Sequence, residues 1–308
     1  MKSVRVDVVI PTYRPGKEFG MLLERLGQQE YPVQKILVMN TEREYWNREW
    51  EKRYPQLEVH HLSKEEFDHG GTRRAAASKS ESDILVFMTQ DALPADTHLI
   101  EKLIQPILEE EKVGASYARQ LPKEGCPYLE QYVRNFNYPE DSCIKRQADV
   151  KKYGVKTYFC SNVCAAYDKE AYLDAGGFVK KTIFNEDMIL AGTMVQKGWG
   201  VAYAAQARVF HSHSYSCREQ FHRNFDLGVS QKEHPEIFGA LSSEGEGVRM
   251  VKNTMAHLWK KKKMQLIPVF FVQSAFKYAG YFLGKRYPCL PGFLVRKCTM
   301  NRAYWEKK

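Results

Sequence analysis

The chain has 308 residues, of which 44% are apolar, and its formal net charge is +9. This length allows one large α/β domain or a domain with an appendage, and the apolar fraction excludes a disordered protein. The positive charge suggests an anionic partner: a nucleic acid, an anionic lipid or a phosphorylated substrate. The seven cysteines form no CxxC pair, so we expect no disulfide or zinc framework and a reducing compartment. The N-terminus lacks an apolar core, so no signal peptide is expected.

Apolar runs alternate with segments of helical pattern in the N-terminal third of the chain. Phe19, Leu22 and Leu26 have the spacing of one helix face. The predicted order is strand 4–10, helix 17–29, strand 35–39, helix 43–54, strand 57–62, a helix from residue 75 and strand 84–88. This alternation predicts an α/β domain whose mostly parallel sheet is flanked by helices. The sequence contains neither a GxGxxG fingerprint nor a P-loop.

Asp91 follows the predicted strand 84–88, which Pro94 prevents from continuing. Open α/β sheets bind ligands at the carboxyl ends of their strands, so Asp91 is a candidate metal ligand. Gly70 and Gly71 precede an alanine-rich helix, where backbone N–H groups could approach an anion and Arg73 would add positive charge. Together these features predict half of a nucleotide-diphosphate site. The alternative is a buried strand, a surface turn and a solvated Asp91.

Three segments, VVIPTY at 8–13, FDHGGTR at 67–73 and MTQDA at 88–92, together resemble family 2 glycosyltransferases, and among them the bacterial rhamnosyltransferases. The resemblance implies the GT-A fold, a nucleotide-sugar donor, a divalent cation (Mg²⁺ or Mn²⁺) and inversion at the anomeric carbon. It places donor contacts at Pro11, Thr12, Tyr13, Asn40, His69, Gly70, Thr72, Arg73, Gln90 and Asp91.

The chain departs from the pattern of this family at two places. Asn40 stands where many members carry an aspartate that binds the nucleobase. The usual DxD metal motif appears only as Gln90-Asp91-Ala92, so one carboxylate is missing. A metal at Asp91 would need further ligands: waters, diphosphate oxygens and one more side chain.

The middle of the chain is expected to contact the acceptor. A helix is predicted at 98–111 and a strand at 113–117, followed by a loop of about forty residues that is rich in aromatic side chains. These aromatic residues suit sugar stacking, or they pack the loop onto the sheet. Residues 156–162 are predicted to form a strand that ends in Ser161 and Asn162, which the resemblance makes acceptor contacts.

Glu186 and Asp187 follow Gly176-Gly177-Phe178 and match the Gly-Gly-Phe…Glu-Asp motif of the family. We assign Asp187 as the general base for the acceptor hydroxyl, with Glu186 as the alternative base or an acceptor-binding group. Acidic residues are also favoured at a helix N-terminus by the dipole alone.

His211 and His213 follow a strand predicted at 199–204 and alternate as on an extended chain, so they would face one side. The resemblance implies that a histidine here reaches the diphosphate or the metal, and we place His213 slightly ahead of His211. The alternative is a structural histidine with satisfied hydrogen bonds.

The C-terminal part has a different character, and we divide the chain into a glycosyltransferase domain at 1–239 and a basic helical region at 240–308. A flexible linker is predicted at 240–247 and a helix at 248–259. The four lysines at 260–263 precede an apolar stretch at 264–283 that contains Gln273 and Lys277. This pattern favours a membrane-proximal helix on an anionic membrane surface. The alternative is a helical hairpin that packs on the catalytic domain or on a second subunit in a homodimer.

The combined expectation is a metal-dependent, inverting transfer of L-rhamnose from dTDP-L-rhamnose to a lipid-linked or cell-surface polysaccharide acceptor. The enzyme would be cytoplasmic and peripheral on the inner face of the cell membrane. A UDP-hexose donor is one alternative, and a non-catalytic basic protein that binds membrane or nucleic acid is another. Nucleic acid is not the expected partner, because the charges cluster in the tail and no nucleic-acid motif is present.

Overall fold

The computed structural model describes residues 4–239 and 244–306. Their contacts group them into two compact units. The first unit comprises residues 1–123, 137–181 and 186–212, and the second comprises 124–136, 182–185 and 213–308. The predicted domain boundary after residue 239 does not coincide with this division by packing, and it stays a prediction.

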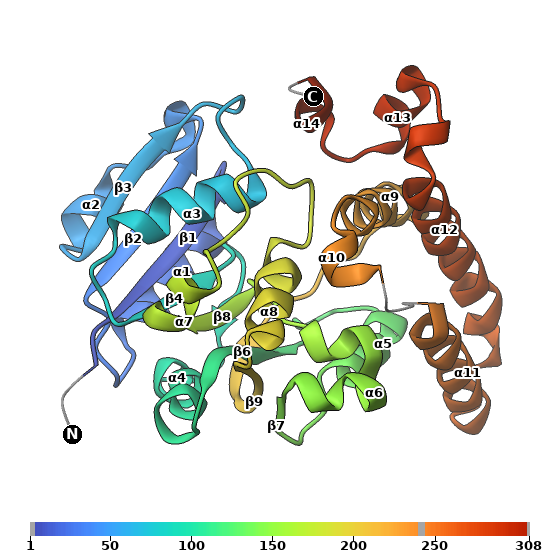
Figure 1. Ribbon diagram of the computed structural model, residues 1–308, viewed down its shortest axis with the longest axis horizontal. Coiled ribbons are helices and arrows are strands. Elements are labelled where there is room, and N and C mark those ends of the chain that lie inside the picture. The colour runs from blue at the N-terminus through green and yellow to red at the C-terminus, as the bar shows by residue number, and fades with distance from the viewer. Residues whose placement is uncertain (1–3, 240–243, 307–308) are drawn as a thin grey trace. The chain divides into compact units, whose positions relative to one another are not determined.

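The first unit is built on a sheet of nine strands (Figure 1). Four neighbours run parallel in the order β3-β2-β1-β4, as the strand–helix alternation predicts. Their bounds are β1 (Val6–Tyr13), β2 (Lys35–Thr41), β3 (Leu57–Leu62) and β4 (Ile84–Met88). The next strand, β8 (Cys164–Asp168), is antiparallel to both of its neighbours. The remaining strands are β5 (Leu93–Pro94), β6 (Val113–Leu121), β7 (Cys143–Lys145) and β9 (Gly200–Phe210).

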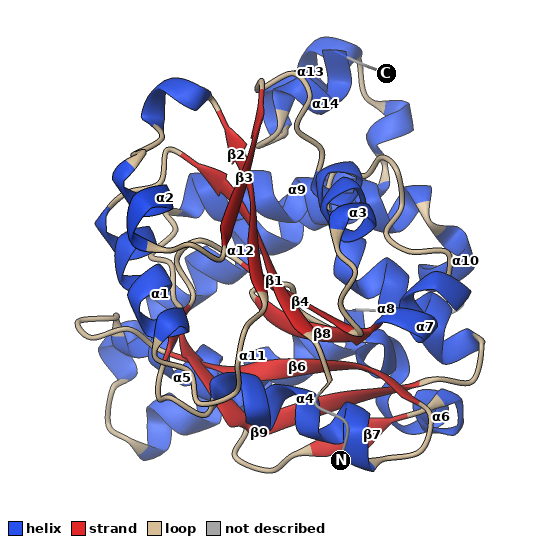
Figure 2. Ribbon diagram, turned by 90° about the vertical axis from the view of Figure 1, so that its left-hand side faces the viewer, coloured by secondary structure: helices blue, strands red, loops and turns tan. Residues whose placement is uncertain are grey.

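Helices cover both faces of this sheet (Figure 2), so its central strands are buried on both sides. Helices α1 (Lys17–Gly27) and α4 (Leu99–Glu109) contribute to one apolar cluster with Val8, Val38 and Val86. The predicted face of α1, with Phe19, Leu22 and Leu26, is buried in it. The opposite face carries α3 (His69–Lys79), α7 (Lys169–Asp174) and α8 (Glu186–Gln196).

The loop of about forty residues predicted after residue 117 is wrong, because β6 continues to Leu121 and further elements follow it. This part of the chain forms α5 (Tyr128–Asn137), β7, η2 (Gln147–Asp149), α6 (Val150–Tyr153) and η3 (Gly154–Tyr158). The strand predicted at 156–162 is wrong as well, because the buried Lys145 amine donates to the carbonyls of Lys156 and Phe159 (3.0 and 2.7 Å) and holds that backbone away from the sheet. The helix predicted at 43–54 is divided into η1 (Arg43–Tyr45) and α2 (Glu49–Arg53).

The second unit is helical. It contains α9 (Cys217–Glu233), α10 (Pro235–Phe238), α11 (Glu244–Lys260), η4 (Met264–Leu266), α12 (Ile267–Lys285), η5 (Tyr287–Cys289), α13 (Gly292–Cys298) and α14 (Arg302–Glu306). Residues 240–243 of the predicted linker lie outside the described residues. The rest of that prediction is wrong, because α11 begins at residue 244.

Helices α9 and α12 pack at backbone distance (Figure 1). A Cβ on Gly280 would lie 2.2 Å from the Phe221 carbonyl oxygen, and one on Gly284 would lie 2.1 Å from that of Phe225. Glycine is therefore required at both positions. By length and composition alone, the segment Met264–Lys285 could cross a membrane, and it is the one such helix among the described residues.

Candidate active site

The turn after β4 carries Asp91 and is tied to the end of β1 through Gln90. The Gln90 side chain accepts from the Tyr13 N–H (2.9 Å) and donates to the Tyr13 carbonyl (3.0 Å). The oxygen and the nitrogen of the Gln90 amide are thus both bonded to the Tyr13 backbone. In the structure Gln90 positions the Asp91 turn.

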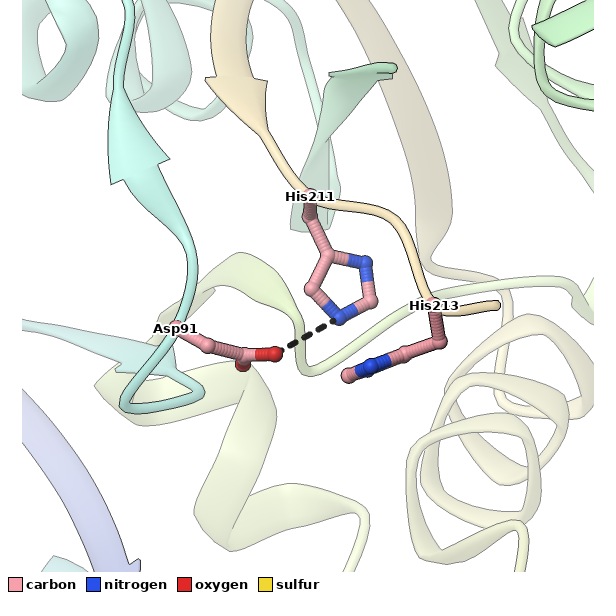
Figure 3. A group of neighbouring side chains, drawn as sticks. All are labelled: Asp91, His211 and His213. Carbon is pink, nitrogen blue, oxygen red and sulfur yellow. Dashed lines mark ion pairs between the residues drawn. The ribbon is translucent and has the colours of Figure 1, made fainter. Parts of the chain in front are cut away.

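His211 faces Asp91, with Nε2 3.5 Å from a carboxylate oxygen (Figure 3). On its other side, Nδ1 lies 3.0 Å from Gln120 Oε1. The orientation of Gln120 is set by its Nε2, which donates to Tyr138 Oη and Ser161 Oγ (2.6 and 3.0 Å). The oxygen of Gln120 must therefore accept from Nδ1–H, so Nε2 is the ring nitrogen that faces Asp91. A neutral imidazole fixed in this tautomer is suited to bind a metal.

His213 adds a third potential ligand. It is the first residue of the second unit and follows His211 by two positions in the chain. One ligand atom from each of Asp91, His211 and His213 lies within 4.8 Å of the other two (Figure 3). The predicted strand at 199–204 extends to Phe210, because β9 pairs with both β5 and β6, so both histidines lie just beyond its end. One carboxylate and two imidazoles fit a divalent cation whose other positions are filled by oxygens.

Glu186 and Asp187 open α8 and have different surroundings. Glu186 lies 3.2 Å from the Arg73 guanidinium, and each of these side chains is only 7% exposed. Glu186 also accepts from Asn162 Nδ2 (3.2 Å). Burial acts to raise the pKa of Glu186, but Arg73 and His69 outweigh it, so the pKa lies below its ordinary value. Glu186 is thus held as a paired carboxylate.

Asp187 is bonded through backbone amides, with the N–H groups of Asn162 and Met188 donating to its two oxygens (3.0 and 2.8 Å). Burial, followed by the negative charge of Glu186, raises the pKa of Asp187 to about 7. A base whose pKa lies near neutrality can accept a proton and release it again during turnover. Asp187 therefore has the properties of a general base.

Asn162 and Ser161, predicted to contact the acceptor, are joined to these groups. Asn162 is 3% exposed, bonds both carboxylates of the α8 start, and accepts from Tyr167 Oη (2.8 Å). Ser161 bonds Gln120, the partner of His211. The segment that carries both residues thus connects Asp187 to the Asp91–His211 pair.

The glycines of α3 do not present free amides. The N–H groups of Gly70 and Gly71 both donate to Asp68, the N-cap of the helix (2.9 Å each). A Cβ on Gly70 would lie 2.2 Å from the Val179 carbonyl oxygen. In the structure these amides are taken by Asp68 and the glycines admit the backbone of Val179 and Lys180, so an anion contact at the glycines stays a prediction.

The two arginines of α3 are occupied as well. Arg74 donates to the carbonyls of Gly176 and Phe178 (2.6 and 2.8 Å), and Arg73 donates to that of His69 (2.9 Å) in addition to pairing with Glu186. Thr72 lies buried on the same helix, with its hydroxyl bonded to the Asp68 N–H (3.1 Å). This helix start braces Glu186, the neighbour of Asp187.

The expected donor residues on β1 and β2 form a buried polar pair. Thr12 Oγ1 donates to Asn40 Oδ1 (2.9 Å), and Asn40 Nδ2 lies 3.1 Å from His61 Nδ1. Pro11 precedes Thr12 on β1, and Tyr13 follows it and is 42% exposed. Beside them, the carboxyl ends of β2 and β3 form a cavity of about 430 Å³ lined by Glu42, Arg43, Glu44, His61, Leu62, Ser63, Lys64 and Glu65. A cavity at the strand ends of an open sheet is where such folds bind nucleotides.

The sequence pattern described as "Glycosyltransferase like family 2" matches residues 4–234. The chain belongs to this family. It is 35% identical over 307 residues to the O-antigen chain rhamnosyltransferase RfbN of Salmonella typhimurium, covering 98% of this chain and 96% of that protein. It is 40% identical over 249 residues to the O-antigen chain rhamnosyltransferase WbaN of Salmonella anatum, covering 80% and 78%. The predicted family and glycosyltransferase class are confirmed.

Solved structures agree on the fold of this glycosyltransferase. A mannosyltransferase from Pyrobaculum calidifontis in complex with GDP-Man and Mn²⁺ superposes with a TM-score of 0.60 at 15% identity, covering 92% of this chain and 88% of that one. S. aureus TarS 1-349 in complex with UDP-GlcNAc gives 0.51 at 13% identity, covering 92% and 91%. The predicted GT-A fold is confirmed.

Several polar residues of the glycosyltransferase site were not found from the sequence. Gln120 lies on β6, which was predicted to end at residue 117, and Tyr167 lies on β8. The aromatic and amide side chains around them carry no motif of their own. His61 could have been selected from the sequence, because it is a polar residue near the end of a predicted strand.

Proposed function

We propose that this glycosyltransferase moves L-rhamnose from dTDP-L-rhamnose to a lipid-linked O-antigen or related polysaccharide acceptor, with inversion at the anomeric carbon. The observation that carries the proposal is the half-buried Asp187 carboxylate, whose pKa is raised to about 7 and which is linked through the Asn162–Ser161 segment to the Asp91–His211 pair.

Asp187 acts as the base in this proposal. It takes the proton of the acceptor hydroxyl while that oxygen forms a bond to the anomeric carbon. The bond from this carbon to the donor diphosphate breaks on the opposite face, and the diphosphate leaves with the electron pair. A single displacement of this kind inverts the anomeric centre. One positioned base contributes about 10²–10⁴-fold to the rate.

Asp91, His211 and His213 would hold a divalent cation. Their donor set fits, since His211 Nε2 faces the Asp91 carboxylate while Nδ1 donates to Gln120 Oε1. The cation, when bound, would neutralise negative charge on the departing diphosphate. The solved relative with Mn²⁺ supports a divalent cation for this fold.

The rhamnose donor is supported by the two Salmonella relatives, both named as rhamnosyltransferases. The alternative is a UDP-hexose. One methyl or hydroxyl difference in an apolar pocket gives only about 10–200-fold discrimination. We therefore expect a clear preference with some turnover of related sugars on the same nucleotide.

We place the enzyme on the cytoplasmic face of the membrane, where a lipid-linked acceptor would be presented. The relatives are named for O-antigen chains, and α12 is long and apolar. Peripheral attachment through the second unit is consistent with the four lysines at 260–263.

The test is a panel of sugar nucleotides with Mg²⁺ or Mn²⁺, read first by thermal shift and then by slow donor hydrolysis. The proposal expects dTDP-L-rhamnose to stabilise the protein most and to be hydrolysed. Asp187→Asn serves as the control, which should bind the donor and fail to turn over. Preference for a UDP-hexose would overturn the rhamnose assignment, and no response to any nucleotide sugar would overturn the donor proposal altogether.

A further inference from the structure

Helix α12 presents one face that is entirely apolar and exposed. Every exposed residue of the helix is apolar, namely Pro268, Val269, Phe271, Val272, Ala275, Phe276, Tyr278, Ala279 and Phe282. These positions recur at intervals of three and four residues, so they lie on one side of the helix. Val272 is 51% exposed and Tyr278 is 60% exposed. A continuous apolar face of this size marks an interaction surface.

Cations flank this face at both ends. Lys260, Lys261 and Lys262 are exposed before the helix, and Lys285 and Arg286 stand at its end. An apolar helix face between cationic ends has the pattern of a helix that lies in the plane of an anionic membrane surface.

A cavity of about 580 Å³ lies where the end of α12 meets the end of α9 and α10. It is lined by Gln231, Lys232, Pro235, Gly239, Tyr278, Tyr281, Phe282, Lys285 and Arg286, which include three cations and no carboxylate. The Arg286 guanidinium stacks on the Phe282 ring, 3.6 Å from its centroid. Phe282 and Tyr278 belong both to the cavity and to the exposed apolar face, so the two surfaces are continuous.

Two carboxylates close by in the chain have partners of their own. Glu233 accepts from Tyr287 Oη and Tyr304 Oη (2.9 and 2.6 Å), and Glu236 pairs with His234 (2.9 Å). A cation near a helix C-terminus is favoured by the dipole alone. That effect does not account for an aromatic cavity that gathers cations from two helices.

We propose that this cavity binds the phosphate of an anionic membrane phospholipid while the exposed face of α12 lies among the acyl chains at the membrane surface. The inference deepens the proposed membrane attachment and is independent of sugar transfer. It shifts the specific lipid contact from the predicted lysines at 260–263 to Lys232, Lys285 and Arg286.

Two other occupants fit less well. A spanning helix would carry its packing partner into the bilayer, and α9, which packs on α12 at backbone distance through Gly280 and Gly284, has a sequence rich in charged residues. A second copy paired through α12 would bring like charges together in either orientation, because both ends of the helix are cationic. A phospholipid offers a phosphate to the cationic cavity and acyl chains to the apolar face.

The experiment is flotation of the full chain with vesicles of phosphatidylcholine, alone or mixed with phosphatidylglycerol. The cavity variant combines Lys232→Gln, Lys285→Gln and Arg286→Gln. The matched control combines Lys17→Gln, Lys79→Gln and Lys151→Gln, which removes the same charge from exposed positions of the first unit. At about fivefold per cation, the cavity variant should lose roughly a hundredfold in partitioning onto the mixed vesicles, while the control changes little.

A second variant tests the apolar face. Val272→Ser with Phe276→Ser should also abolish flotation, whereas Leu173→Ser, at an exposed apolar position of α7, should not. Flotation of the wild type on vesicles of phosphatidylcholine alone would overturn the phospholipid site. Equal losses of flotation in the cavity variant and in its charge-matched control would overturn it as well.

Three readouts separate the remaining outcomes. Stabilisation of the wild type by inorganic phosphate without vesicles, lost in the cavity variant, would reassign the cavity to a soluble phosphate. A dimer in size-exclusion chromatography that the Val272→Ser, Phe276→Ser variant dissociates would reassign the face to a second copy. Donor hydrolysis should be equal in the wild type and the cavity variant, so failure of the sugar-transfer proposal would be seen separately from failure of flotation.

Discussion

Arg73 and Glu186 form a buried ion pair at 3.2 Å, with each side chain only 7% exposed. Arg73 comes from the glycine-rich helix start and Glu186 from the Glu-Asp motif. The pair keeps Glu186 charged directly beside Asp187, whose pKa is raised first by burial and then by Glu186. In the proposed mechanism Glu186 therefore acts on Asp187 through its charge, as a positioning residue.

Glu186→Gln should lower the pKa of Asp187, because the neighbouring negative charge is gone. Asp187 must be deprotonated to act as the base, so the acid limb of the turnover profile should move to lower pH. A pH profile of kcat for the wild type and the variant measures this shift. A uniform loss of activity with an unmoved limb would show that Glu186 has only a structural role.

The same substitution should destabilise the protein, because it leaves the Arg73 charge buried without its partner. Breaking a buried pair costs about 3–5 kcal/mol. The control is the double variant Arg73→Gln, Glu186→Gln, which removes both charges and should recover part of the loss in urea unfolding. A double variant less stable than Glu186→Gln would contradict the assigned pair.

Asp187→Asn should bind the donor with near-normal affinity and lose turnover by about 10²-fold or more, since the amide cannot accept the acceptor proton. In the wild type, turnover should fall as the pH drops below about 7, where Asp187 becomes protonated. Isothermal titration with the donor and steady-state kinetics separate binding from turnover. An equal loss of donor affinity would reassign Asp187 to binding.

Gln120→Leu should weaken divalent-cation binding by about 10–100-fold, because His211 Nδ1 loses the acceptor that fixes its tautomer. His211→Ala and Asp91→Asn should each weaken binding at least as much. Mn²⁺ titration followed by electron paramagnetic resonance measures the affinity without any turnover. Unchanged Mn²⁺ affinity in all three variants would remove the metal from this position.

The raised pKa of Asp226 predicts that the stability of the second unit depends on pH. It accepts from Thr299 Oγ1 and the Met300 N–H (2.6 and 2.9 Å), and burial raises its pKa to about 7. The folded state therefore holds a proton that the unfolded state releases near pH 4. This contribution to the free energy of unfolding is complete below that pH and is lost as the pH rises toward 7. Asp226→Asn should flatten the dependence by on the order of a few kcal/mol, as measured by urea unfolding across the range.

The sequence alone determined the parallel half of the sheet, the helix of Phe19 and Leu26, and the glycosyltransferase family. These features follow from short-range periodicity and from motifs whose residues lie close together in the chain. Asp91, His211 and Asp187 could be selected because each lies beside a strand end or a helix start.

Tertiary structure decided what those motif residues contact. The amides of Gly70 and Gly71 bind Asp68 and the Arg73 guanidinium binds Glu186, so in the structure a helix start that resembles an anion site holds protein carboxylates. Likewise, Lys145 turns a predicted strand at 156–162 into a 3₁₀ helix and a loop by binding its carbonyls. A buried donor, acceptor or charge must find a partner, and that partner is chosen by three-dimensional proximity, which local sequence patterns do not encode.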